Sequence, residues 1–240
     1  MRASLFLFAV IGGIFLITAI FLPARTDDRL CQIKGVSGGL DTSDSTVSNF
    51  FPEGFAEGLL PDTCGTERPR LSDGETRWFS RQWAAACEPP LPSALSGQLD
   101  DQFTFRFSFM PSFDTPIFMR LETHRETHRL IAKQMTGDGG YEPGIILRSK
   151  EIEISDEEVA AIRKSLANIF ANRDAEVAKA RSEGPKETCF GMLDGTMWIF
   201  EVVENDRYDL IQRNSPNDGP IFDLGMQLLS KSDWVDFGEP

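Results

Sequence analysis

The stretch Gln102 to Phe109, QFTFRFSF, decides the fold because its side chains alternate in polarity. Phenylalanine occupies every second position from Phe103 to Phe109, and Arg106 lies among the polar residues between them. Successive side chains of a β-strand point to opposite faces, so this pattern predicts a strand with one buried and one solvent-facing side. The stretch PIFMRLE, residues 116–122, repeats the alternation and places Arg120 on the same outer side. The sequence therefore predicts a sheet that carries arginines on its exposed face.

Further strands are expected along the chain, over residues 129–135, 144–154, 188–193, 196–203 and 207–213. Short loops connect most of them, which indicates antiparallel neighbours. The loop MTGDGGYEPG, Met135 to Gly144, is typical of a connection between two strands, because glycines supply positive φ and Pro143 fixes the exit. The alternative is a ligand-binding loop that presents Tyr141 and Glu142.

Three helices are expected beside these strands. The first begins near Thr76 and ends before the prolines at 89 and 90. The second begins at Ser155, which forms a capping-box pattern with Glu158, and ends at Gly184. The third covers residues 221–232. Together, these strands and helices predict an α+β protein, with an antiparallel sheet of about six or seven strands and helices packed on one face.

The amino-terminal segment predicts a membrane anchor. No charged residue occurs from Leu5 to Leu22, and this stretch would measure about 27 Å as a helix. An uncleaved anchor over residues 1–25 fits better than a signal peptide, because the apolar stretch is long and no small-x-small cleavage site follows it. A flexible spacer is expected over 26–72, and one globular domain over 73–240, in the periplasm or outside the cell. Secretion after cleavage is the alternative.

Cysteine and histidine positions limit the chemistry. The four cysteines lie beyond the predicted anchor and are candidates for disulfides in an oxidising compartment: Cys31, Cys64, Cys87 and Cys189. Free thiols in a reducing compartment are the alternative, and the wide spacing does not match a zinc site. The two histidines, His124 and His128, would share one face of a helix and chelate zinc there, but the flanking alternation predicts a hairpin tip instead. We expect no metal and no cofactor.

The charge of the chain bears on its partners. The formal net charge is −13, and basic residues are not clustered, so nucleic acid is not expected as a partner. A basic protein would be attracted to such a chain. The alternative is that excess acidic residues simply keep an exported domain soluble.

The outer face of the predicted sheet is a candidate binding surface. Arg106 and Arg120 are expected there, and Glu201 and Arg213 are expected on a comparable face of the later strands. Guanidinium groups gathered above a sheet would bind a carboxylate or a peptide terminus. Ordinary cross-strand salt bridges on a wetted face are the alternative.

Four segments in order, WFSRQWAAACEPPL, FTFRFSFMPSFDTPIFMRLE, AKQMTGDGGYEPG and GMLDGTMWIFE, carry a resemblance. The chain resembles an uncharacterised family of bacterial exported or lipoprotein-like proteins with a Gly-Gly-Tyr-Glu-Pro-Gly motif and a Leu-Asp-Gly motif followed by Trp. The stretch ETHRETHR departs from the family's short glycine-rich hairpin. The resemblance implies a domain rather than a reaction. It highlights Arg106, Arg120, Lys133, Tyr141, Glu142, Asp194, Trp198, Glu201 and Arg213.

These observations lead to three hypotheses about function. The first is a membrane-tethered, envelope-facing domain that binds a protein or peptide, for example as an inhibitor or immunity partner. The second is an envelope hydrolase in which Glu142 or Glu201 is the general base and Arg120 or Arg213 holds the substrate, which requires one cleft for all four. The third is a structural envelope protein without a discrete site.

Overall fold

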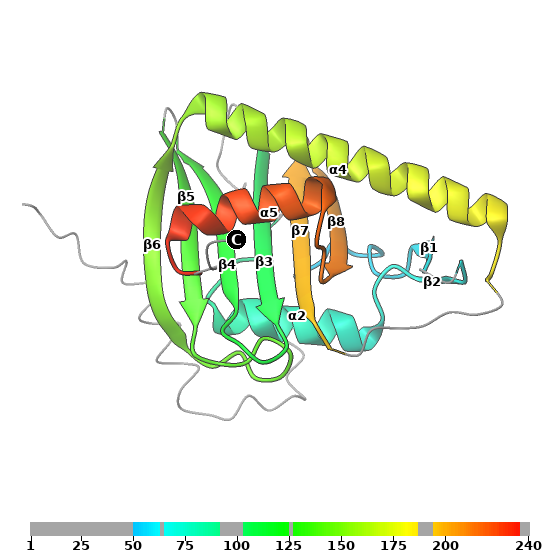
Figure 1. Ribbon diagram of the computed structural model, residues 1–240, viewed down its shortest axis with the longest axis horizontal. Helices are drawn as coiled ribbons and strands as arrows, with labels where there is room; N and C mark the ends of the chain where they lie inside the picture. Colours follow the sequence, from blue (N-terminus) through cyan, green and yellow to red (C-terminus); the bar gives the residue numbers. More distant parts are fainter. Residues whose placement is uncertain (1–49, 63–64, 92–102, 125–126, 187–193, 236–240) are drawn as a thin grey trace, which may run out of the picture.

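The computed structural model describes residues 50–62, 65–91, 103–124, 127–186 and 194–235. Its elements, in chain order, are β1 (Leu59–Pro61), β2 (Glu67–Pro69), α2 (Asp73–Ala85), β3 (Phe103–Pro111), β4 (Ile117–His124), β5 (Thr127–Met135), β6 (Ile146–Ile154), α4 (Asp156–Glu183), β7 (Thr196–Glu204), β8 (Arg207–Asn214) and α5 (Gly219–Ser232). Figure 1 shows how they are arranged.

A six-stranded antiparallel sheet forms the centre of the molecule. Its strand order is β6-β5-β4-β3-β7-β8, and β1 and β2 form a separate two-stranded ribbon. The predicted α+β class and the antiparallel sheet are confirmed. The strand expected over 188–193 lies outside the described residues, and β7 instead pairs with β3 and β8. In this register Arg106 lies opposite both Arg120 and Glu201.

Helices cover both faces of the sheet, so the expectation that they pack on one face is wrong. On one face, Phe105 and Phe107 of β3 pack with buried residues of α4 and α5. On the other face, Met110 of β3 and Phe118 of β4 pack against α2. Figure 1 shows α4 and α5 in front of the strands and α2 behind them. A strand such as β3 is buried on both sides, because each face of the sheet is covered by a separate layer.

Part of the predicted spacer belongs to the folded domain. Phe50 is buried, and the ring of Phe51 lies 5.4 Å from that of Trp83 in α2. The ring of Phe55 lies 4.7 Å from that of Tyr208 in β8. The aromatic residues that follow position 49 therefore fix this segment onto the α2 side of the sheet, and the domain begins before residue 73.

The predicted starts of the first two helices need one correction. Capping boxes are present at Ser72 with Glu75 and at Ser155 with Glu158, so the first helix begins a few residues earlier than expected and the second begins as predicted. Gly184, with φ of 73°, ends α4. The buried residues of α4 all lie in its first half, and its second half extends beyond β8 (Figure 1).

The described residues contain no helix that is long and apolar enough to cross a membrane. The predicted anchor, residues 1–25, lies outside the described part of the chain. Its role therefore stays a prediction.

Substitution of Gly225 tests the contact between α5 and the sheet. A Cβ atom at Gly225 would lie 2.0 Å from Cζ3 of Trp198, so we expect Gly225→Ala to lower the free energy of unfolding by about 1–3 kcal/mol. This loss should exceed the gain of about 1 kcal/mol that alanine brings to a helix. Gly74→Ala in α2 is the matched control, because its Cβ would meet only Ser72 Oγ at 3.8 Å. Urea unfolding measures the free energy of unfolding of both variants. Equal stability of the two would contradict the proposed contact between Gly225 and Trp198.

Candidate functional site

Five charged side chains meet between the sheet and the end of α2. This buried ion network consists of Glu88, Arg106, Arg120, Lys133 and Glu201. Arg106 donates two hydrogen bonds to Glu201, from Nε to Oε2 at 2.6 Å and from Nη2 to Oε1 at 2.9 Å. Glu88 accepts from Arg120 Nε at 2.8 Å and pairs with Lys133 Nζ at 3.1 Å. Charge pairs thus join four neighbouring strands to the segment that follows α2.

The cations of the network also satisfy the backbone where α2 ends. Lys133 Nζ donates to the carbonyl oxygens of Ala86 and Cys87, at 3.0 and 3.2 Å. Arg106 Nη1 donates to the carbonyl oxygen of Pro89 at 2.9 Å. The last carbonyls of a helix lack partners within the helix and carry partial negative charge, which cations stabilise. The last turn of α2 has no basic residue of its own, so the strands supply the cations.

Aromatic side chains cover the network. The guanidinium carbon of Arg106 lies 4.1 Å from the ring centroid of Trp83, and the indole of Trp83 donates to Ser108 Oγ at 3.0 Å. The hydroxyl of Tyr208 donates to Glu201 Oε1 at 2.8 Å. Burial and the neighbouring Glu201 carboxylate raise the pKa of Tyr208 well above its ordinary value. The phenol therefore stays protonated and keeps donating this hydrogen bond.

The expectation that Arg106 and Arg120 face solvent is wrong. Arg106 is 0% exposed and Arg120 is 7% exposed, because α2 and the segment before it cover this face of the sheet. Burial alone would raise the pKa of Glu88, but the charges of Arg120, Lys133 and Arg106 outweigh burial and lower it. Burial raises the pKa of Glu201, and Arg106 opposes this only in part. The network holds α2 on the sheet, and it presents no surface to an external ligand.

The loop that contains Tyr141 and Glu142 connects β5 to β6, as predicted. Tyr141 is 58% exposed, and its ring lies 5.9 Å from that of Phe113. Glu142 is exposed and pairs with Arg81 of α2. A Cβ atom at Gly139 would lie 2.8 Å from the carbonyl oxygen of Pro111, so the glycine allows this loop to pack tightly against the end of β3. Whether the loop binds a ligand stays a prediction.

Trp198 and the histidines lie away from the ion network. Trp198 is 4% exposed and belongs to the core on the α4 and α5 side. His128 Nε2 lies 2.9 Å from Asp156 Oδ1 at the start of α4, and His124 ends β4. Among the residues that the structure describes, no group of three or more His, Cys, Asp and Glu side chains is placed to hold a metal ion.

Cys87 is disulfide-bonded. Cys31, Cys64 and Cys189 lie outside the described residues, so the pairing stays a prediction.

The four residues of the hydrolase hypothesis do not share a cleft. Glu142 is exposed on the β5–β6 loop, while Glu201 and Arg120 are buried in the ion network with different partners. Arg213 lies at the sheet edge and pairs with Glu176 of α4. The arrangement that this hypothesis requires is therefore absent from the described residues.

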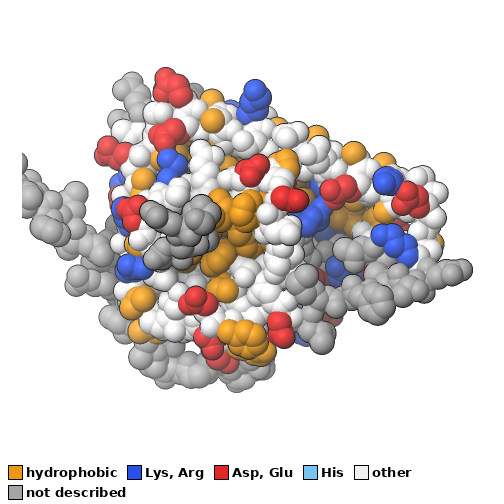
Figure 2. All heavy atoms as spheres, in the orientation of Figure 1, with side chains coloured by type: hydrophobic (Ala, Val, Ile, Leu, Met, Phe, Trp, Pro, Cys, Tyr) orange, Lys and Arg blue, Asp and Glu red, His pale blue; other side chains and the backbone are white. Residues whose placement is uncertain are grey.

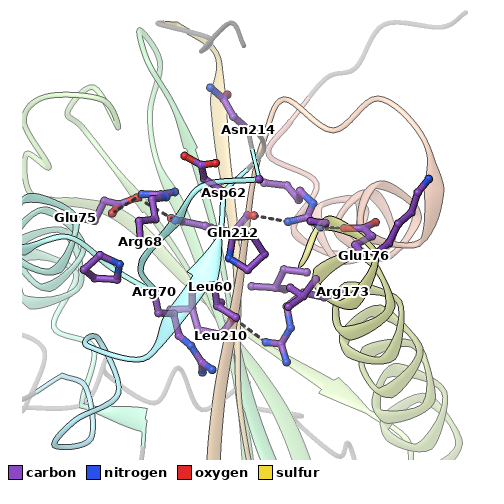
Figure 3. A pocket seen from close by; sticks show the side chains of 18 of the residues that line it. Leu60, Asp62, Arg68, Arg70, Glu75, Arg173, Glu176, Leu210, Gln212 and Asn214 are labelled. Atoms are coloured by element: carbon purple, nitrogen blue, oxygen red, sulfur yellow. Dashed lines mark hydrogen bonds and ion pairs between the residues drawn. The ribbon is translucent and has the colours of Figure 1, made fainter. Parts of the chain in front are cut away.

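A groove of about 600 Å³ runs along the free edge of β8, between α4 and the β1–β2 ribbon. We call it the edge groove. Figure 3 shows side chains of α4 on one side of it and side chains of the β1–β2 ribbon, with Arg70, on the other. Strand β8 lies between these two walls. Arg181 of α4 links the two walls, since it donates to Glu67 Oε1 at 2.7 Å and to the carbonyl of Leu59 at 2.9 Å. Of the predicted site residues described in the structure, Arg213 alone lines this groove.

The lining of the edge groove is basic within an acidic chain. Six of its residues are basic and four are acidic, whereas the whole chain carries a net charge of −13. The basic residues are Arg68, Arg70, Arg173, Lys179, Lys186 and Arg213. Figure 2 shows charged side chains of both signs gathered at the end of the molecule where α4 extends beyond the sheet. Arginines at such a site favour carboxylate or phosphate groups, which they bind with two parallel hydrogen bonds.

Two polar atoms of groove residues lack a hydrogen-bond partner. Arg70 Nε and Gln212 Oε1 are both buried, and neither forms a hydrogen bond within the described residues. The remaining groups of both side chains are held in place: Arg70 Nη1 lies 3.5 Å from Asp209 Oδ1, and Gln212 Nε2 donates to Glu75 Oε1 at 3.0 Å. Both atoms are enclosed by the protein, so neither faces the open groove. The size of the edge groove and the excess of basic residues in its lining make it the candidate functional site.

No protein-family model matches the chain, and a search of curated proteins found no significant similarity.

Sequence reasoning missed most of the edge groove because its walls come from elements far apart in the chain. One signal was present in the second half of α4, where Arg173, Val177 and Ala180 recur at helical spacing. These three residues are half-buried and lie beyond the main apolar stripe of the helix. Such a second stripe indicates that another segment packs there. The sequence does not say which segment that is.

Loss of the Glu88 charge tests the ion network. We expect Glu88→Gln to lower the free energy of unfolding by about 3–5 kcal/mol at neutral pH, because it leaves buried cations without their counter-charge. The folded pKa of Glu88 is lower than its ordinary 4.5, so its stabilisation is present above that value and is lost as the pH falls through the folded pKa. The difference between variant and wild type should therefore shrink in acid.

Urea unfolding at neutral and acidic pH measures this difference. Glu142→Gln is the control, since removal of its exposed pair with Arg81 should cost less than about 1 kcal/mol. A Glu88→Gln protein as stable as wild type at neutral pH would contradict the role assigned to the network.

Proposed function

We propose that this protein is a membrane-tethered, envelope-facing binding domain whose edge groove receives an acidic segment of another protein or a peptide. The basic lining of the groove within an acidic chain is the observation that carries this proposal. The tether and the envelope location rest on the apolar stretch before residue 25 and on the cysteines beyond it. The groove also favours binding over a structural role, because such a role requires no concave site.

The charge of the whole chain narrows the class of ligand. A net charge of −13 repels large polyanions at distances beyond the groove, so the local basic lining is suited to a short acidic segment rather than to nucleic acid. Arg68 and Arg213 are the residues best placed to meet such a segment, because their side chains are 45% and 38% exposed. Each is paired with one groove glutamate, Glu75 and Glu176 respectively. A ligand carboxylate would compete for the remaining guanidinium donors.

Charge reversal inside the groove tests the proposal. The probe is a fluorescent peptide that alternates glutamate with valine, compared with peptides in which lysine or serine replaces glutamate. We expect the full-length protein in detergent micelles to bind the glutamate peptide best, and Arg68→Glu with Arg213→Glu to weaken that binding at least about tenfold, since charge-assisted hydrogen bonds contribute about 1.5–3 kcal/mol each. Fluorescence anisotropy measures the affinities.

The control carries the same change of charge outside the groove. Lys164 of α4 and Arg207 of β8 are exposed and do not line the groove, so Lys164→Glu with Arg207→Glu should leave the affinity within about twofold of wild type. Equal binding of all three peptides, or equal loss in both double variants, would refute an acidic ligand in the edge groove.

A further inference from the structure

We propose that the ligand of the edge groove binds as an extended strand that adds to β8. This inference rests on the function proposed above for the same groove, and it specifies how the ligand is held. The strand order places β8 at the edge of the six-stranded sheet, with β7 on its other side. Edge strands offer unpaired N–H and C=O groups, and peptides bind many sheet edges by pairing with them.

The geometry of β8 shows that its edge, rather than one of its faces, lines the groove. Five consecutive residues, Leu210 to Asn214, line it. Side chains of a strand alternate between the two faces, so a groove over one face would be lined by every second residue only. A row of consecutive residues is expected where the groove runs along the backbone itself.

The hydrogen bonds around β8 identify which residues direct their backbone into the groove. Ser215 N donates to the carbonyl of Thr196, the first residue of β7, at 2.8 Å. Residues of an antiparallel strand alternate between facing the partner strand and facing away, so Gln212 and Leu210 face away from β7. The carbonyl of Leu210 accepts from Arg173 Nη1 at 3.2 Å, and its N–H donates to Asp209 Oδ1 at 2.8 Å.

These contacts leave the open part of the edge around Gln212. Leu210 is already capped on both of its backbone groups, which prevents pairing at that end. The carbonyl of Gln212 accepts from Arg213 Nη1 at 3.2 Å, and Arg213 is a half-exposed side chain that a ligand is able to displace. Displacement would free the guanidinium of Arg213 to bind a carboxylate of the incoming strand.

The walls of the groove fit the same occupant. The walls formed by α4 and the β1–β2 ribbon restrict access to one strand and so protect β8 from open-ended pairing between sheets. A volume of about 600 Å³ lies within the range of ordinary ligand pockets.

N-methylated probes test strand addition without changing the protein. In an extended peptide that alternates glutamate with valine, the N–H groups of the glutamates point to one edge and those of the valines to the other. We therefore make one probe that is N-methylated on every glutamate and a second that is N-methylated on every valine. We expect one of the two to bind the full-length protein about tenfold more weakly than the unmethylated peptide, and the other to bind as well as it does, because only one edge pairs with β8.

Amide hydrogen exchange of the protein provides a second measurement. The N–H of Gln212 should exchange rapidly in the free protein and slowly with saturating unmethylated peptide, while the N–H of Ile211, which faces β7, should change little. Gln212→Pro removes this donor and should weaken binding about tenfold, whereas Gln212→Ala keeps the donor and should weaken it less.

The outcomes separate this inference from the proposed function. Equal binding of both methylated probes and the unmethylated peptide overturns strand addition and leaves an acidic ligand in the groove intact. Slow exchange at Gln212 in the free protein also overturns it, because another segment of this chain then covers the edge. Failure of the unmethylated glutamate peptide to bind overturns the proposed function and this inference together.

Discussion

The fold depends on the sharing of Glu88 between Arg120 and Lys133. Its two carboxylate oxygens pair with cations from neighbouring strands, while Arg106 pairs with Glu201 beside them. Cations taken out of water are tolerated only when their charge and their donors are both satisfied, so the segment after α2 must occupy one position on the sheet. That position places α2 and the aromatic segment from Phe50 over the second face. The β1–β2 ribbon, which lies between them in the chain, is thereby brought to the edge of the sheet.

The sequence was sufficient to predict most of the strands and helices, but it was insufficient to predict how they pack in layers. Alternation from Phe103 identified a strand, and the Ser155–Glu158 box identified the start of α4, because both patterns are local. The same alternation gave the wrong environment for Arg106. Polar residues on alternate positions indicate a wetted face only if no second layer covers it, and Glu88 lies outside the predicted sheet. One sign of a second layer over this face was available in the sequence. It was a helix that contains Trp83 and is followed by Glu88 and two prolines.

The edge groove could not be predicted from the sequence for a related reason. It is formed where two layers extend past the last strand, and the amount of extension depends on the length of α4 and on where the ribbon packs. Arg213 was identified as a candidate from its place on an alternating strand, although the surface expected for it was a different one. Residues such as Arg68 and Arg70 carried no signal, because the segment around them resembles a spacer in composition.

The uneven burial of α4 has a consequence for the mobility of this protein. Its first half is held by buried side chains over the sheet, whereas its second half has no buried side chain and is held by ion pairs of Arg173 with Asp209, Glu176 with Arg213 and Arg181 with Glu67. A helix held in this way frays from its weaker end on warming, long before the core melts. The wall of the groove that α4 forms would therefore unfold first. A ligand that contacts both walls would stabilise this part of the helix against thermal unfolding and proteolysis.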